Sequence, residues 1–188
     1  MHNNFLVKAV VRYFPQTVFY SSTGDLAIKI PSHIVKNFLF FLKKNSKYQY
    51  KLLVDISALD CFDKKSRFEI FYNILSVQKN SRIVVTTTVY ENKFVPTITS
   101  IYSAADWYER EIWDMFGVFF ENHPNLRRIL TDYSFKGHPL RKDFPLAGYL
   151  EVSYQDFLRR VVHEKVKLSQ EYRVFSLENP WIDLVNEK

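Results

Sequence analysis

Three β-rich runs within residues 50–90 decide the fold: YKLLVDIS at 50–57, FEIFYNIL at 68–75 and IVVTTTVY at 83–90. Each run is dense in β-branched or aromatic residues, which fit the pleated surface of a sheet. The polar connections at 60–65 and 78–81 have the composition of turns. Three consecutive strands joined in this way predict a meander.

The residues before these runs predict a helix, a hairpin and a second helix. The first helix covers about residues 5–13, and the strands at 17–21 and 26–30 flank a Ser-Thr-Gly-Asp turn. A helix with apolar residues at 3.6-type spacing then begins at Pro31, with Ser32 as its N-cap. This order predicts an α+β fold in which helices pack on a mixed or antiparallel sheet.

A third helix is predicted between residues 103 and 117, because Gly117 suits the left-handed residue that ends a helix. A projection at 100° per residue places Trp107 in the core-facing stripe and Glu111 inside the same stripe. A buried carboxylate is costly unless it is paired, so we expect Glu111 to face inward and to pair with Arg127 or Arg128.

The opposite side of this helix carries Asp106, Arg110 and Asp114 at i, i+4 spacing, which predicts a row of ion pairs. Trp113 falls among these charges, where a large aromatic side chain has no partner within the helix. We therefore predict that Trp113 contacts another protein.

The chain changes character beyond Leu130. The stretch GHPLRKDFP at 137–145 contains two prolines, which exclude a helix and a central strand. The residues from 149 onward are rich in aromatics but offer no second core. We expect a globular α+β domain over 1–135 and an extended C-terminal arm over 136–188 that lies on partner proteins. The residues expected at this interface are Arg141, Lys142, Asp143 and Trp181.

The net charge of +6 is concentrated in the first quarter of the chain. Residues 1–51 hold eight Lys or Arg and one acid, Asp25, for a net charge of +7, while residues 52–188 carry −1. This excess is compatible with a solvated basic face, and it motivates one alternative function, a basic RNA-binding or ribosomal module. The aromatic residues, however, fall at core periodicity and no RNP-type run is present.

The sequence lacks the residues or motifs that several common kinds of binding site and segment require. Cys61 is the single cysteine, which forbids an internal disulfide and a thiolate-only cluster. The five histidines are scattered, and the four glycines are too far apart for a dinucleotide or P-loop fingerprint. No apolar run reaches the ~18 residues of a membrane span, and no secretory signal is evident. A free-standing acid/base enzyme using Glu109 and Glu111 is a third hypothesis.

The third helix also begins a longer pattern. EREIWDMFG at 109–117 is followed by His123-Pro124, by LRRIL at 126–130 and by GHPLRKDFP at 137–145. This pattern resembles the thirty-kilodalton component of respiratory complex I, the proton-pumping NADH:ubiquinone oxidoreductase. We call the residues that carry the resemblance the signature residues. They are Glu109, Arg110, Glu111, Asp114, Gly117, His123, Pro124, Arg127 and Arg128.

The resemblance implies a component without catalytic residues. In this family the FMN, the iron–sulfur clusters and the quinone are bound by partner subunits. The partners are other complex I subunits, chiefly the large quinone-cavity subunit and its iron–sulfur neighbours. The implied location is the matrix side of the mitochondrial inner membrane, in the peripheral arm, or the cytoplasmic face of the plasma membrane in a bacterium. The short chain resembles the organelle-encoded members.

Overall fold

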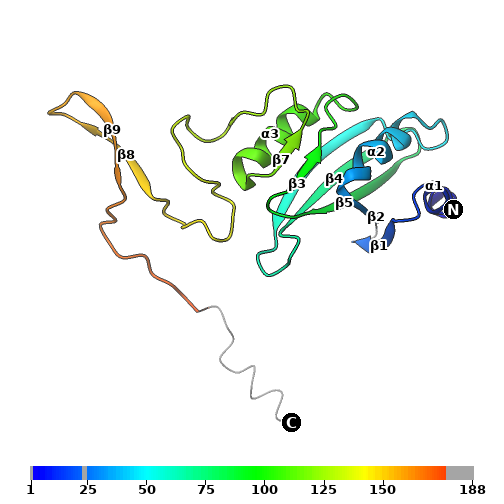
Figure 1. The fold of residues 1–188 in the computed structure, drawn as a ribbon, viewed down its shortest axis with the longest axis horizontal. Helices are drawn as coiled ribbons and strands as arrows, with labels where there is room; N and C mark the ends of the chain where they lie inside the picture. Colours follow the sequence, from blue (N-terminus) through cyan, green and yellow to red (C-terminus); the bar gives the residue numbers. More distant parts are fainter. Residues whose placement is uncertain (1, 23–24, 177–188) are drawn as a thin grey trace, which may run out of the picture. The chain divides into compact units, whose positions relative to one another are not determined.

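The structure is a computed structural model that describes residues 2–22 and 25–176 (Figure 1). The chain divides into two compact units, the first ending at Phe144 and the second beginning at Pro145. The division therefore lies later than the boundary expected at residue 135. The cause is a set of hydrogen bonds that hold residues 138–143 to the rest of the first unit.

The first unit contains the predicted sheet. Its strands are β1 (Val18–Ser22), β2 (Asp25–Pro31), β3 (Leu52–Asp60), β4 (Phe68–Ser76) and β5 (Ser81–Val89). They are arranged in the order β1-β2-β5-β4-β3. The strands β3, β4 and β5 form the predicted antiparallel meander, and β2 pairs parallel to β5. The α+β class and the mixed sheet are confirmed.

Three helices accompany the sheet: α1 (His2–Tyr13), α2 (Val35–Lys44) and α3 (Ala105–Phe116). The prediction for the start of α2 was wrong in detail. Strand β2 runs through Pro31, a short 3-10 turn (η1, Ser32–Ile34) follows, and no side-chain cap from Ser32 is formed. Gly117 ends α3 with φ of 74°, as predicted.

The core lies between one face of the sheet and the helices. Alternate residues of β4 are buried, among them Phe68, Ile70, Tyr72 and Ile74. They belong to one apolar cluster with Phe38 of α2 and with residues of α3. Both helices therefore cover the same face of the sheet, as Figure 1 shows.

Two small sheets were not predicted. In the first unit, β6 (Phe94–Pro96) precedes α3 and β7 (Phe119–Glu121) follows it, and the two strands pair in parallel. In the second unit, β8 (Leu150–Gln155) and β9 (Arg160–Lys165) form an antiparallel hairpin in place of a fully extended arm. None of the helices within residues 2–22 and 25–176 has the length and hydropathy of a membrane span.

The burial pattern of α2 gives a test of the core. Phe38 is fully buried and Phe40, on the same helix, is half exposed. We predict that Phe38→Ala lowers the free energy of unfolding by about 3–5 kcal/mol, because it removes a buried ring and leaves a cavity. Phe40→Ala is the matched control and should change it by less than about 0.5 kcal/mol. Equal losses in urea unfolding of the two variants would contradict this placement of the core.

Candidate functional site

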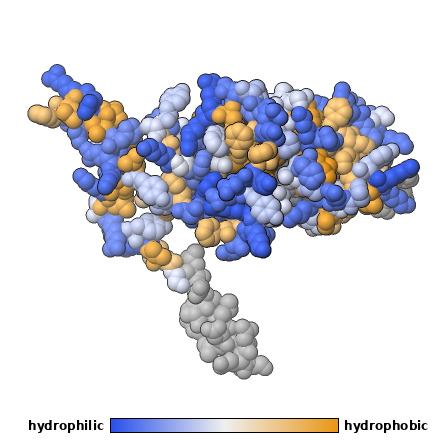
Figure 2. Space-filling view, in the orientation of Figure 1, coloured by the Kyte–Doolittle hydropathy of each residue, from blue (hydrophilic) through white to orange (hydrophobic). Residues whose placement is uncertain are grey.

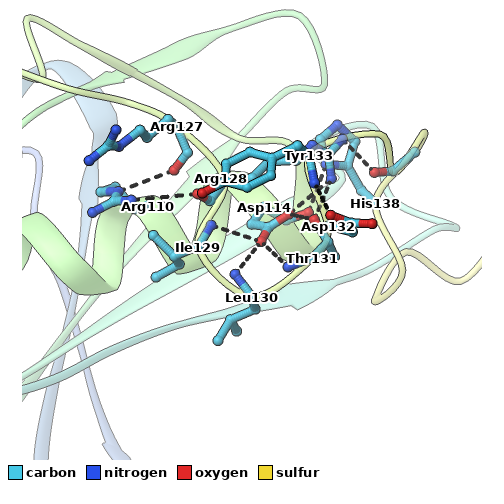
Figure 3. A network of polar contacts seen from close by, with 11 residues as sticks. Arg110, Asp114, Arg127, Arg128, Ile129, Leu130, Thr131, Asp132, Tyr133 and His138 are labelled. Carbon is cyan, nitrogen blue, oxygen red and sulfur yellow. Dashed lines mark hydrogen bonds and ion pairs between the residues drawn. The ribbon is translucent and has the colours of Figure 1, made fainter. Parts of the chain in front are cut away.

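Three of the signature residues, Arg110, Arg127 and Arg128, lie around a fourth, Asp114, at the C-terminal half of α3 (Figure 3). Its buried carboxylate accepts hydrogen bonds from three consecutive backbone amides, those of Ile129 (3.2 Å), Leu130 (2.8 Å) and Thr131 (2.9 Å). The Thr131 hydroxyl (2.5 Å) and Arg128 Nη1 (2.9 Å) donate to the second oxygen. One carboxylate thus fixes the course of the loop after β7.

These donors also set the charge of Asp114. Burial by itself would raise the pKa of this carboxyl, but the hydrogen bonds from Thr131, Leu130 and Ile129 outweigh it and hold the pKa at about 2. The carboxylate is ionised at neutral pH, and all of its partners belong to the same chain. It is therefore engaged in structure and presents no free lone pair to a substrate.

Two arginines extend this network on either side of Asp114. Arg110 is buried and donates from Nε to the carbonyl oxygen of Arg127 at 3.1 Å. Arg128 reaches beyond Asp114 and donates from Nη2 to the carbonyl oxygen of Gly137 at 2.8 Å. The predicted row of ion pairs between Arg110 and its neighbours on α3 is wrong, because loop carbonyls take its hydrogen bonds.

Of the last four carbonyls of α3, the first keeps a regular i to i−4 hydrogen bond and the other three accept hydrogen bonds from residues beyond the helix. Gly117 N donates to Trp113 O (2.9 Å), His138 Nδ1 to Asp114 O (3.0 Å), Leu140 N to Met115 O (3.1 Å) and Arg141 Nε to Phe116 O (2.6 Å). A Cβ on Gly117 would come within 2.5 Å of His138 and 2.6 Å of Arg141. Gly117 is therefore required both by its positive φ and by this close approach.

A buried ion pair at the end of the sheet holds the same segment. Arg67 donates to both carboxylate oxygens of Asp60, at 2.8 and 3.0 Å, and to Asp143 at 2.7 Å. Asp60 also accepts a hydrogen bond from the backbone amide of Lys142 at 2.8 Å, and Arg141 pairs with Glu91 at 2.9 Å. The hydrogen bonds from Arg67 lower the pKa of Asp60 against the opposing effect of burial.

These contacts bear on one sequence expectation. Residues 141–143 were expected to contact partner proteins as part of an extended arm; Arg141, Asp143 and the Lys142 amide bond to the first unit, and their contact with partners stays a prediction. The segment is a strap on its own domain, although the side chain of Lys142 is exposed. Trp181, the fourth expected interface residue, lies outside the described residues.

Glu109 is the second fully buried carboxyl of α3. It accepts hydrogen bonds from the Thr97 hydroxyl (2.5 Å) and the Ile98 amide (2.8 Å), which attaches the segment after β6 to the helix. Burial is the main cause that raises the pKa of Glu109 to about 7, with a smaller contribution from Asp106 and opposition from its hydrogen bonds and from Lys36.

His123 lies beside Glu109 with its ring fully buried. Its Nδ1 accepts a hydrogen bond from the Asn125 amide at 3.1 Å, so the neutral ring carries its proton on Nε2. Nε2 lies 3.3 Å from an oxygen of Asp106 and 3.8 Å from an oxygen of Glu109. Neither contact has the geometry of a hydrogen bond, so Nε2 is a buried polar atom without a hydrogen-bond partner in the described part of the chain.

The helical projection of α3 was wrong about Trp107 and Glu111, while the predicted contact of Trp113 with another protein stays a prediction. Trp107 is 64% exposed and stacks on Arg110 at 5.3 Å, and Glu111 is exposed and has no ion pair within the described part of the chain. Trp113 is half-buried and packs edge-on against Phe119 and His138. The projection followed hydropathy, whereas hydrogen-bond partners in the loops allow Glu109, Arg110 and Asp114 to be buried together with Ala105 and Ile112.

The remaining signature residues, Pro124 and Arg127, are exposed. Sequence reasoning missed Asp60, Arg67 and Thr97, which lie far from the signature in the sequence and meet it only in the fold. Within the described ranges no three His, Cys, Asp or Glu side chains gather closely enough to hold a metal ion. The arrangement holds loops and helix ends in place.

Comparisons with known proteins agree on one family. Residues 28–150 match the family described as the 30 kDa subunit of respiratory-chain NADH dehydrogenase. The chain is 51% identical to NADH-ubiquinone oxidoreductase subunit 9 of Prototheca wickerhamii, over 96% of this chain and 95% of that protein. It is 49% identical to the protein of the same name from Reclinomonas americana, over 94% and 85%. A subunit of the NADH-quinone oxidoreductase of Paramagnetospirillum magneticum is 42% identical, over 92% and 88%.

A solved structure is similar as well. A chain of the membrane-bound sulfane sulfur reductase, an archaeal respiratory membrane complex, superposes with a TM-score of 0.66 and 28% identity. The match covers 78% of this chain and 87% of that one.

The hydrogen bonds of Asp114 predict a large cost for its neutralisation. Asp114→Asn replaces one acceptor oxygen by a donor that faces other donors, so the free energy of unfolding should fall by about 3–5 kcal/mol. Glu111→Gln makes the same change of charge on an exposed position of the same helix and should cost less than about 0.5 kcal/mol. Urea unfolding of both full-length variants measures the difference; similar stabilities would contradict the role given to Asp114.

The burial of Glu109 predicts a pH dependence. Its folded-state pKa of about 7 lies above its ordinary value of 4.5, so its contribution to stability is fully present below pH 4.5 and is lost as pH rises through 7. Glu109→Gln resembles the protonated acid, so the melting temperature of this variant should fall less than that of the wild type between pH 5 and 8. Glu111→Gln is the control and should follow the wild type; parallel curves for all three proteins would refute the prediction.

Proposed function

Because the chain belongs to the family of the 30 kDa subunit of respiratory-chain NADH dehydrogenase, we propose that it is a non-catalytic structural component of the peripheral arm of complex I. In this role it supports the subunits that bind the quinone and the iron–sulfur clusters, while FMN, clusters and quinone are bound by those partners. Its place is the matrix side of the mitochondrial inner membrane, or the cytoplasmic face of the membrane in a bacterium.

The observation that carries this proposal is the use of the charged signature residues. Asp114, Arg110 and Arg128 bond to loops of the same chain, and Glu109 bonds to the Thr97–Ile98 segment. A catalytic carboxylate needs an approach for substrate, whereas the two acids are fully buried. These contacts support a role in shaping the protein over a role in the reaction.

Two apolar surfaces support contact with partner subunits. Leu150, Val152, Tyr154 and Val161 lie on one face of the β8–β9 hairpin, and each is 48–60% exposed. Apolar residues of this unit are visible at the surface in Figure 2. A two-stranded hairpin is at best marginally stable in water, so an apolar face of this kind favours a second surface. The second apolar surface is in the first unit, where the rings of Trp113 and Phe119 pack edge-on against each other.

The family match favours this role over the RNA-binding alternative, which rests on the positive charge of residues 1–51 and on the 17% aromatic content. The acid/base enzyme hypothesis has no structural support, because Glu111 is solvent-exposed and Glu109 is buried and hydrogen-bonded.

The apolar face of the hairpin gives the test. We predict that Val152→Ser combined with Tyr154→Ser lowers the amount of assembled complex several-fold, because the substitutions remove apolar area from the proposed contact. The matched control, Ser153→Ala with Gln155→Ala, changes the polar face of the same strand and should assemble normally. Native electrophoresis with mass spectrometry measures assembly, and NADH:quinone turnover is expressed per assembled complex.

The two readouts separate the structural role from a catalytic one. A structural role predicts fewer complexes with near-normal turnover in each. Full assembly combined with loss of turnover would contradict the proposal, and so would a chain that never accompanies the other subunits of the complex.

A further inference from the structure

The positive charge of residues 1–51 remains unexplained by the contacts of the first unit. Two of its lysines are engaged: Lys29 pairs with Glu69, and Lys43 donates to the carbonyl oxygen of Ile101. The others have no carboxylate within ion-pair distance in residues 2–22 and 25–176. Neither α1 nor α2 contains an acidic residue.

Aromatic contacts bring the ends of these two helices together. The ring of Tyr13, at the end of α1, lies 5.5 Å from that of Phe41 on α2. Phe41 in turn lies 6.0 Å from Tyr48, in the turn that follows α2. Phe14 anchors the same junction by packing edge-on against Phe38 and Phe41 in the core. The three rings therefore connect two basic segments of sequence.

Exposed cations flank this ring cluster. Arg12 precedes Tyr13, Lys47 precedes Tyr48, and Lys44 follows Phe41 by three residues, which places it on the same side of α2. Lys8 lies one turn before Arg12 on the same face of α1. Phe40 lies one turn before Lys44 on the same face of α2. We call the surface formed by Lys8, Arg12, Tyr13, Phe40, Phe41, Lys44, Lys47 and Tyr48 the basic–aromatic surface.

This surface also exposes apolar area. Tyr13 is 63% exposed, and Val11 and Phe40 on the two helices are each about half exposed. A cation at a helix C-terminus is favourable, which accounts for Lys44, but Lys47 lies beyond the helix and Lys8 lies in the middle of α1. Like charges grouped around apolar side chains are complementary to a partner with carboxylates and apolar residues.

We propose that the basic–aromatic surface of α1 and α2 docks an acidic segment of another protein subunit, which places apolar side chains on Tyr13 and Phe40 and carboxylates beside Arg12, Lys44 and Lys47. The inference rests on the proposed function, since it requires the chain to be part of a complex. A protein segment fits better than RNA, because Phe41 and Tyr48 pack on neighbouring rings and are not exposed as stacking platforms.

Zero-length cross-linking in the purified complex tests this directly. A carbodiimide joins a lysine amine to a carboxylate in contact with it and adds no spacer. The proposal predicts amide links from Lys44 or Lys47 to Asp or Glu residues of one segment in another subunit, identified by mass spectrometry. Lys65 and Lys93, which are exposed in the turns at the opposite end of strands β3 to β5, serve as control amines.

A charge-reversal pair adds a functional readout. Lys44→Glu with Lys47→Glu should lower incorporation of the full chain into the complex by about tenfold, because it sets carboxylates against carboxylates. Lys65→Glu with Lys93→Glu makes the same change of charge at the opposite end of the strands and should incorporate normally. Reversal of the cross-linked acidic residues to Lys should restore incorporation of the first variant.

The outcomes distinguish this inference from the function on which it rests. A chain that is present in the complex but gives no link from Lys44 or Lys47 to another subunit overturns the inference alone. Ultraviolet cross-linking of this surface to RNA, or photolabelling of it by anionic lipid, would also overturn it. Absence of the chain from the complex would overturn both proposals.

Discussion

The carboxylate of Asp114 is the interaction on which the rest of the site depends. A short run of backbone amides cannot find partners within its own loop, and an unpaired buried amide costs free energy. Asp114 satisfies the amides of residues 129–131 with a single oxygen, and Arg128 and Thr131 with the other. These hydrogen bonds hold the loop at residues 129–131 in place, and the same hydrogen bonds stabilise the ionised form of Asp114.

The end of α3 also holds residues 138–141, the first part of the segment at 138–143, against the rest of the first unit. Every helix leaves its last carbonyls without intrahelical donors, and here His138, Leu140 and Arg141 supply donors for the carbonyls of Asp114, Met115 and Phe116. The Asp60–Arg67 pair then holds residues 142–143 against the sheet. Residues that are distant in sequence are thus joined in one connected polar network around α3.

The sequence predicted the sheet well because alternation and β-branched runs such as IVVTTTVY report burial directly. It failed on α3, where hydropathy assigned Trp107 to the core and Glu111 to an ion pair. Burial of Glu109, Arg110 and Asp114 depends on donors and acceptors from residues 97–98 and 127–131, which no pattern within the helix can reveal. The same reason hid Asp60 and Arg67, whose partners in the strap lie about 80 residues away.

The central claim, that Asp114 holds the loop at residues 129–131, can be measured most directly by amide hydrogen exchange in the full chain. If the carboxylate binds these three amides as described, they should exchange at least ~100-fold more slowly than in an unstructured peptide, although they lie outside any helix or strand. Exchange of all three at the rate of an unprotected loop would contradict the account.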